Sequence, residues 1–422
     1  MSNTVKSAIV FGLILGGLLL LDCKQPPAAV ERPVPIVSKR ITYYDQATYQ
    51  KLTELWQKYY KAFPSEDSYG NWMKAARYAN HPEYEKLLAK GLKKYPSNPT
   101  LLYLSGMIRA GIGEPEATAK VERAMQLDPS FTDPIFALVV NYMALGEREK
   151  SDAMLRRLIE LGAVNEEVMD YSYNMLAQLE PNAILITNGD NDTYPGWILT
   201  RIEKFRPDVV LVNRSLMNTT WYPEIVAKDI GLPFVTTQQI TDIRNFRDQQ
   251  TKAKTRQPGA GMYADTLIAR IIESAKSSDR PLYFAITMMN SPELAKYSEN
   301  GVFIGLSTLV TPCSNRETVA TALADDFPKI FRTNGLDSWR MKHVKESDAG
   351  KMLLKNYARV IAHFVSSDHS IATEKKLTLF QWYRAHAEPL LSLDEQKEFG
   401  AIWKKWSELP EVKTWLTGLN IP

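Results

Sequence analysis

The sequence predicts an α region followed by an α/β region. A short helical-repeat domain comes first, and an α/β domain with a mostly parallel sheet and C-terminal helices follows. Between residues 50 and 165, apolar positions recur with a period near 34 residues, the spacing of stacked helix pairs. Between 166 and 366, short apolar runs alternate with helical spacing, as in strands joined by crossover helices. The last segment, 367–422, has the spacing of amphipathic helices.

The composition excludes one class of partner. The chain has 422 residues, and its 51 basic and 48 acidic side chains leave a formal net charge of +3. No basic stripe with interleaved aromatic residues occurs, so we expect no nucleic-acid partner. An apolar fraction of 45% in a chain of this length suffices for more than one hydrophobic core.

Residues 1–23 have the pattern of an export signal. Lys6 precedes fourteen mostly apolar residues, 8–21, and a membrane-spanning helix needs about 20. The sequence Leu20-Leu21-Asp22-Cys23 resembles the cleavage box of bacterial lipoproteins, which predicts that Cys23 is acylated. We therefore expect an exported lipoprotein, anchored in a membrane and facing the periplasm or the cell exterior. A short uncleaved signal anchor is the alternative.

Residues 24–49 predict an extended tether, because four prolines lie between positions 26 and 35. The chain contains 2 cysteines, so a protein lipidated at Cys23 has no internal disulfide. The other cysteine, Cys313, follows a proline and has no recognisable histidine partner. Its setting is more typical of packing than of a nucleophile.

Residues 50–165 carry the helical repeat. Two sets of positions recur at its spacing: Leu88, Leu92 and Pro96 as Val121, Met125 and Pro129, and Val121, Ala124 and Leu127 as Leu155, Leu158 and Leu161. Small residues lie between the expected helices: Gly106, Ala110 and Ala137. The segment resembles the tetratricopeptide (TPR) family, whose stacked helix pairs commonly hold an extended peptide on their inner face. The resemblance implies a protein partner; a helical cap that only packs on the next domain is the alternative.

The α/β domain, 166–366, begins with a strand–loop–helix–strand unit. Residues 183–187 form an apolar run, a helix-like stretch follows the loop 188–195, and a second apolar run, 209–212, comes after the break at Arg206-Pro207. This order predicts a right-handed βαβ unit with parallel strands. Further strands are expected at 282–287 and 302–306.

Two segments surround these strands in the expected fold. The polar stretch 238–261 has few apolar residues and predicts either a mobile lid or disorder. A helix with Leu267, Ile268, Ile271 and Ile272 on one face follows it. The four tryptophans of segment 367–422 indicate core packing more than a sugar-stacking platform: Trp382, Trp403, Trp406 and Trp415.

The loop 188–195 is the expected functional site, since ligands of open α/β sheets bind at the carboxyl ends of strands. The candidate ligand-binding residues lie on this loop and at the end of the neighbouring strand: Asn188, Asp190, Asn191, Asp192, Thr193, Tyr194, Asn213 and Ser215. Asp190 and Asp192 are the candidates for holding a divalent cation, for contacting a glycan, or for acid–base catalysis. The alternative is structural: Asp192 or Thr193 caps the following helix and Asp190 forms an Asx turn.

Several sequence segments are similar to those of a second family: Glu180 to Leu185, Asn188 to Pro195, Arg206 to Val209, Val212-Asn213, Trp221-Tyr222, Pro281 to Ala285 and Asn356-Tyr357. Over 168–364 the chain resembles the soluble C-terminal domain of a bacterial family of multi-pass membrane proteins of unknown function, related to protein O-mannosyltransferases. In that family the glycosyl-transfer chemistry is expected in the membrane-embedded half. No apolar run long enough to span a membrane follows the signal here, so the resemblance does not carry catalysis over.

The sequence therefore leaves three functional hypotheses. The first is a lipid-anchored binding or scaffold protein, with repeats for a protein partner and an α/β domain for a ligand, accessory to cell-envelope glycosylation. The second is a carbohydrate-active enzyme that uses Asp190 and Asp192. The third is a structural envelope protein. No His-Glu-x-x-His, Gly-x-Ser-x-Gly or phosphate-binding glycine loop points to another chemistry.

Overall fold

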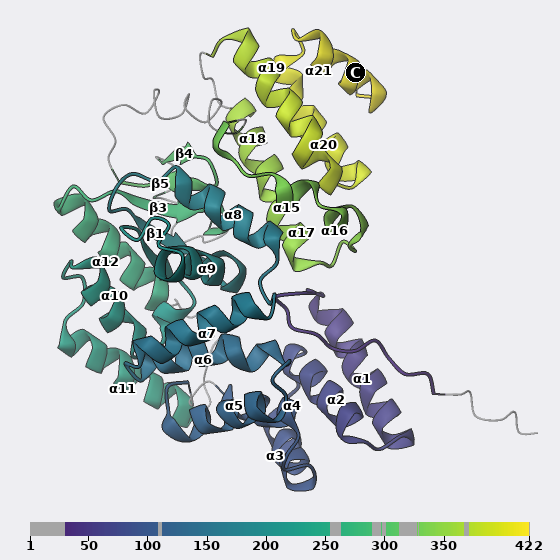
Figure 1. Cartoon of the computed structure of the whole chain (residues 1–422), viewed down its shortest axis with the longest axis vertical. Helices are drawn as coiled ribbons and strands as arrows, with labels where there is room; N and C mark the ends of the chain where they lie inside the picture. The colour runs from purple at the N-terminus through teal and green to yellow at the C-terminus, as the bar shows by residue number, and fades with distance from the viewer. Residues whose placement is uncertain are drawn as a thin grey trace, which may run out of the picture.

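The computed structural model describes residues 30–108, 112–253, 263–288, 297, 301–311, 327, 329–366 and 371–421. The predicted signal, Cys23 and Cys313 lie outside these ranges. Figure 1 shows a layer of helices at the N-terminal end, a small sheet flanked by helices in the middle, and a further group of helices that ends the chain. No helix of the described ranges is long and apolar enough to cross a membrane.

Within the described residues, eight α-helices precede the first strand. Their bounds are α1 (Gln46–Ala62), α2 (Glu66–Tyr78), α3 (Tyr84–Lys94), α4 (Pro99–Gly106), α5 (Pro115–Leu127), α6 (Thr132–Ala144), α7 (Arg148–Glu160) and α8 (Glu166–Ala177). Local sequence fixes several starts: the Asp45 carboxylate accepts from the Thr48 amide at 2.7 Å, and Asn98 caps α4 directly before Pro99. Gly106 lets α4 approach α5, because a Cβ there would lie 2.5 Å from Cγ2 of Val121.

Residues 30–43, called the strap below, run without helix or multi-residue strand to a turn at 39–41 and pack on the body. Ile36 and Ser38 are buried, and the backbone amide of Ala349 donates to the carbonyl of Ile41 at 3.0 Å. The amide of Tyr43 likewise donates to Ser347 at 2.9 Å. The expected tether 24–49 is thus not free over its described part, and α1 already begins at Gln46. The residues that hold the strap are distant from it in the sequence. The local composition of the strap therefore does not predict these contacts.

The sheet has the order β2-β1-β3-β5-β4. Its strands are β1 (Ile184–Thr187), β2 (Val210–Asn213), β3 (Leu282–Ala285), β4 (Val302–Ile304) and β5 (Ser307–Leu309). β1 pairs in parallel with β2 and β3, which confirms the parallel pairing of the βαβ unit. The mostly parallel sheet is a wrong prediction, since β5 pairs antiparallel with both β3 and β4. Gly305, at φ 53°, turns the chain between β4 and β5, a conformation that glycine adopts readily.

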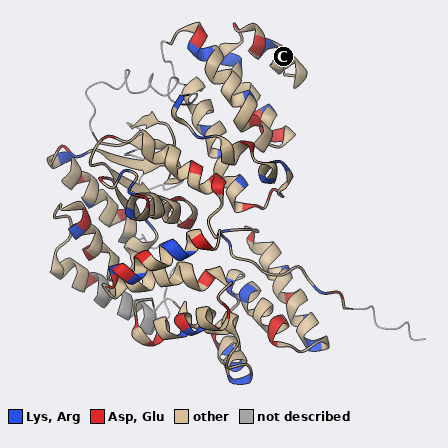
Figure 2. Cartoon of the chain, in the orientation of Figure 1, with Lys and Arg blue, Asp and Glu red and all other residues tan. Residues whose placement is uncertain are grey.

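Helices cover the sheet, and the strands themselves carry no charged residue (Figure 2). The crossover from β1 to β2 consists of α9 (Asp190–Trp197) and a π-helical turn, η2 (Ile198–Ile202). After β2 follow η3 (Leu216–Asn218), α10 (Tyr222–Ile230), α11 (Thr237–Ala253), α12 (Tyr263–Ser277) and, behind β3, η4 (Ile286–Met288). α12 buries the four apolar residues expected on one face.

α11 corrects the prediction for 238–261. Residues 237–253 form a helix rather than a lid or a disordered stretch, and residues 254–261 lie outside the described ranges. Ile240 is buried, whereas Phe246 is exposed. A single buried apolar residue in the first turns is too weak a periodic signal to predict a helix from sequence.

The turn Arg206-Pro207-Asp208 closes the C-terminal end of α8. The Arg206 guanidinium donates to the carbonyls of Leu176 (3.0 Å), Leu179 (2.6 Å) and Glu180 (2.8 Å), and both oxygens of Asp208 accept from it. Arg206 has φ 51°, a left-handed conformation that is uncommon for a side chain of its size. Its hydrogen bonds to these three carbonyls, one at the end of α8 and two just beyond it, offset that strain.

The C-terminal helices enclose an aromatic core. They are α15 (Asn334–Asp337), α16 (Trp339–His343), α17 (Ala349–Leu354), α18 (Asn356–Ser366), α19 (Thr373–Trp382), η5 (Tyr383–Ala387), η6 (Glu388–Leu390), α20 (Leu393–Trp403), η7 (Lys404–Trp406) and α21 (Pro410–Gly418). All four tryptophans singled out in the sequence are buried, and Trp403 and Trp406 pack edge to face with centroids 5.4 Å apart. They serve as core, as their spacing predicted.

Candidate functional site

The loop between β1 and α9 lies at the carboxyl end of β1, beside the end of β2. Asn213 donates from Nδ2 to the Gly189 carbonyl at 3.2 Å and to Oγ1 of Thr193 at 2.9 Å. The hydroxyl of Ser215 donates to the Asn188 carbonyl at 3.0 Å. The two residues expected from β2 thus meet the loop, and their hydrogen bonds go to the loop itself.

Thr193 and Tyr194 also fix the loop, through contacts to β1 and α6. The hydroxyls of Thr193 and Thr187 share a hydrogen bond of 2.6 Å in the interior. The Tyr194 hydroxyl donates to the Phe136 carbonyl on α6 at 2.9 Å, and the two rings pack edge to face. Tyr194 therefore links the loop to α6, and neither side chain lines the cleft described below.

Asp192 caps its own helix. Its Oδ1 accepts from the Gly189 amide and its Oδ2 from the Asn188 amide, both at 2.9 Å, and the Thr287 hydroxyl donates to Oδ2 at 2.5 Å. The residue is only 3% exposed. Burial raises the pKa of Asp192, although these three hydrogen bonds act in the opposite direction. This geometry matches the structural alternative, in which Asp192 is a cap.

Asp190 is held by a residue that the sequence did not single out. Arg40, on the strap, donates from Nη1 to Oδ2 of Asp190 at 2.7 Å and from Nη2 to Oδ1 of Asp133 at 2.6 Å. The guanidinium carbon of Arg40 lies 4.2 Å from the ring centre of Phe136. Burial opposes the charge of Arg40, but the two carboxylates outweigh it and raise the pKa. Nothing local in the sequence marks this arginine, since its partners are far along the chain.

The strap, the loop and the C-terminal helices enclose a cleft of about 990 Å³. Four of the predicted residues line it: Asn188, Asp190, Asn191 and Asp192. The strap contributes Lys39, Arg40 and Tyr43, and Thr287 follows β3. The opposite wall comes from α17, α18 and α20 and includes Met352, Lys355, Asn356, Arg359, His363, Glu395, Glu398 and Phe399. The last group was missed, because only the fold brings these helices to the loop.

Charges in the cleft balance each other. Its lining has four lysines or arginines (Lys39, Arg40, Lys355, Arg359) and four carboxylates (Asp190, Asp192, Glu395, Glu398). Lys355 donates to both Oε1 and Oε2 of Glu395 and to Glu346, and these carboxylates raise its pKa against the effect of burial. Burial and the nearby Arg77 lower the pKa of Lys39. The cleft therefore offers many hydrogen-bonding groups and little net charge.

The predicted cation pair is not assembled in the described part of the chain. Asp190 accepts from an arginine, and Asp192 accepts from two amides and a hydroxyl. No group of three or more His, Cys, Asp or Glu side chains within the described ranges has an arrangement that could hold a metal ion. Both carboxylates are instead committed to donors from the protein.

Comparison with known families gives one match. The family model described as TMEM260-associated domain 2 matches residues 168–230, which run from α8 through β1, α9 and β2 to the end of α10. No curated protein matches the chain. The match covers the loop 188–192 and the Arg206 turn, and it fits a family related to the O-mannosyltransferases. The segment that builds the floor of the cleft is thus similar to TMEM260-associated domain 2.

Proposed function

We propose that the chain is a lipid-anchored, extracytoplasmic binding protein whose cleft holds a neutral oligosaccharide. The observation that carries the proposal is the balance of charge among the polar side chains that line this large cleft. Sugar hydroxyls both donate and accept, so paired charges and amides bind them without selecting an ion. Tyr43, which is half exposed at the cleft wall, offers an aromatic face for the apolar side of a sugar ring.

Binding without turnover is favoured over catalysis by the state of the two loop acids. A general acid or base must be within reach of the substrate proton and carry a suitable pKa. Asp192 is turned to the amides of its own loop, and Asp190 is paired with Arg40. The resemblance to a family related to protein O-mannosyltransferases supports a role accessory to cell-envelope glycosylation.

We also propose that α1–α7 are TPR-like repeats that bind a protein partner. Successive helices pack as neighbours, α1 with α2, α4 with α5 and α6 with α7, which is the arrangement of stacked helix pairs. The close approach at Gly106 and the burial of Ala137 agree with the small residues that such repeats place between helices.

Calorimetry with a panel of neutral oligosaccharides tests the cleft. We expect binding by the full chain and about a tenfold weaker affinity for Arg359→Ala, since one charge-assisted hydrogen bond contributes about 1.4 kcal/mol or more. Arg123→Ala is the matched control. Both arginines are exposed on a helix and donate to a side-chain amide three positions away, Arg359 to Asn356 and Arg123 to Gln126.

Three outcomes contradict the proposal. Equal effects of the two arginine substitutions would place the ligand elsewhere. Conversion of the oligosaccharide during incubation, detected by mass spectrometry, would make the protein an enzyme. Failure of every sugar in the panel to bind would leave a structural envelope protein as the better description.

A further inference from the structure

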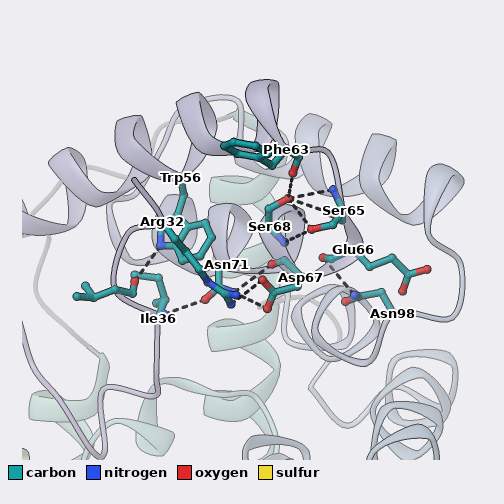
Figure 3. Close-up of polar contacts among 11 residues, drawn as sticks. Arg32, Ile36, Trp56, Phe63, Ser65, Glu66, Asp67, Ser68, Asn71 and Asn98 are labelled. Carbon is teal, nitrogen blue, oxygen red and sulfur yellow. Dashed lines mark hydrogen bonds and ion pairs between the residues drawn. The ribbon is translucent and has the colours of Figure 1, made fainter. Parts of the chain in front are cut away.

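The strap is held by contacts to its backbone. Nε1 of Trp56 on α1 donates to the Val34 carbonyl at 3.0 Å, and the Ile36 amide donates to Oδ1 of Asn71 on α2 at 2.9 Å (Figure 3). Asn71 is itself fixed, because its Nδ2 donates to the carbonyl and the carboxylate of Asp67. Such contacts recognise an extended chain whatever its side chains are.

Side chains of the strap add selectivity at every fourth position. Arg32 pairs with Asp67 at 2.9 Å and lies over the ring of Trp56. Ile36 is 3% exposed and belongs to the hydrophobic core of the repeats. Arg40 pairs with Asp133 on α6. Val34 and Val37, in contrast, are exposed. An extended chain advances about 13 Å in four residues, which separates Arg32 from Ile36, and the turn that follows brings Arg40 to α6.

Helices α1, α2 and α6 build one of the faces that hold the strap. We call it the strap-binding face, formed by Trp56 on α1, Asp67 and Asn71 on α2, and Asp133 and Phe136 on α6. Trp56 is buried in the core of α1 and α2, and Phe136 packs on Tyr194. The strap contributes no helix or multi-residue strand to this core. Its removal therefore exposes a face that helix packing still supports.

Room remains beside the strap for a larger occupant. A second cavity of about 320 Å³ adjoins the strap-binding face and is also lined by Asp67 and Asn71. Its other polar groups include Glu66, Lys74 and Asp128. Three carboxylates against one lysine favour a basic side chain in this cavity. The strap itself carries Arg32, Lys39 and Arg40, so the charges of face and occupant are complementary.

We propose that the strap-binding face is a site for extended basic peptides, and that residues 30–43 are its intramolecular occupant. The peptide class has a basic residue, an apolar residue four positions on and a second basic residue four positions further, as Arg32, Ile36 and Arg40 have. A partner segment of this class displaces the strap. The inference rests on the proposed protein-binding role of the repeats.

The experiment adds a labelled peptide of residues 30–44 to the full chain and measures fluorescence anisotropy. In a released variant, Ile36→Asp with Arg40→Ala weakens the strap and leaves the strap-binding face unchanged. We expect the released variant to bind the peptide at least tenfold more tightly than the wild-type chain, whose face is occupied. A peptide with the same two substitutions is the control and should bind neither chain.

Further variants keep the test decisive. Adding Asn71→Ala and Asp133→Ala to the released variant should abolish peptide binding. Should the released variant fail to fold by circular dichroism, a protease site between Tyr44 and Asp45 of the wild-type chain replaces it. After cleavage, the strap should exchange with the labelled peptide, as followed by native mass spectrometry.

The inference would be overturned if the released variant bound the control peptide as tightly as the unsubstituted peptide. It would also be overturned if the cleaved strap did not exchange with the labelled peptide. If a protein partner still binds the full chain in that case, it uses another face of the repeats. The proposed protein-binding role would then survive while this site would not.

Discussion

Arg40 and Asp190 lie 150 positions apart in the chain, and their side chains meet at 2.7 Å. The same guanidinium reaches Asp133, so one strap residue joins the repeats to the loop of the α/β domain. The backbone oxygen of Arg40 also accepts from Nδ2 of Asn191 at 3.1 Å. The loop is therefore positioned from outside its own domain as well as by β1 and β2.

The two loop aspartates should respond differently to replacement by alanine. Asp190 is 47% exposed, and such a pair contributes less than about 1 kcal/mol to stability. Asp192→Ala leaves the amides of Asn188 and Gly189 without their acceptor, which costs about 2 kcal/mol or more. Urea unfolding measures both. We also expect Asp190→Ala to weaken oligosaccharide binding. A larger loss of stability for Asp190→Ala than for Asp192→Ala would contradict this assignment.

Arg206 should be irreplaceable even by lysine. Its planar guanidinium serves three carbonyls and both oxygens of Asp208, whereas an ammonium group cannot reach them all. We expect Arg206→Lys and Arg206→Ala each to lower the free energy of unfolding by about 2–4 kcal/mol. Arg148→Ala, which removes an exposed ion pair with Asp229, is the control and should change it by less than about 1 kcal/mol. Full stability of the lysine variant would refute the role of the guanidinium fork.

The pair of Arg206 and Asp208 should make the free energy of unfolding decrease at acid pH. The hydrogen bonds from Arg206 lower the pKa of Asp208 from 3.8 to about 2. Because the folded-state pKa is the lower one, the stabilisation is fully present above pH 3.8 and is lost as the pH falls through about 2. An NMR titration of the Asp208 carboxyl should have its midpoint near 2. In Asp208→Asn, the decrease in unfolding free energy between pH 4 and 2 should be smaller than in the wild type; an unchanged decrease would exclude this carboxyl as a source.

Lipidation at Cys23 is tested by its removal. We expect the wild-type protein to partition into the detergent phase, and Cys23→Ser to be released or to remain an unprocessed precursor. Cys313→Ser changes the other cysteine and should leave partitioning and size unaltered. Identical behaviour of both variants and the wild type would disprove the lipoprotein assignment.

The sequence predicted those parts of the fold in which a local run of apolar residues is also a buried strand. The apolar runs before Asn188 and after Arg206 became the parallel pair β1 and β2. The single strand expected at 302–306 instead contains β4 and the turn at Gly305 that leads into β5. Only the part of the site that follows a recognisable strand was predicted. Asn188 to Asp192 lie on a recognisable strand end, whereas the wall from α17, α18 and α20 depends on long-range packing.

The packed strap has a consequence for how far the protein can stand from a membrane. A free tether of 26 residues, 24–49, would let the body range widely above a bilayer. With residues 30–43 bound to the body, only residues 24–29 separate Cys23 from the fixed part of the chain. Fully extended, the chain from Cys23 to Val30 spans at most roughly 25 Å. If Cys23 is acylated, Val30 stays within that height of the lipid headgroups, and release of the strap would lengthen the connection and let the body move further from the membrane.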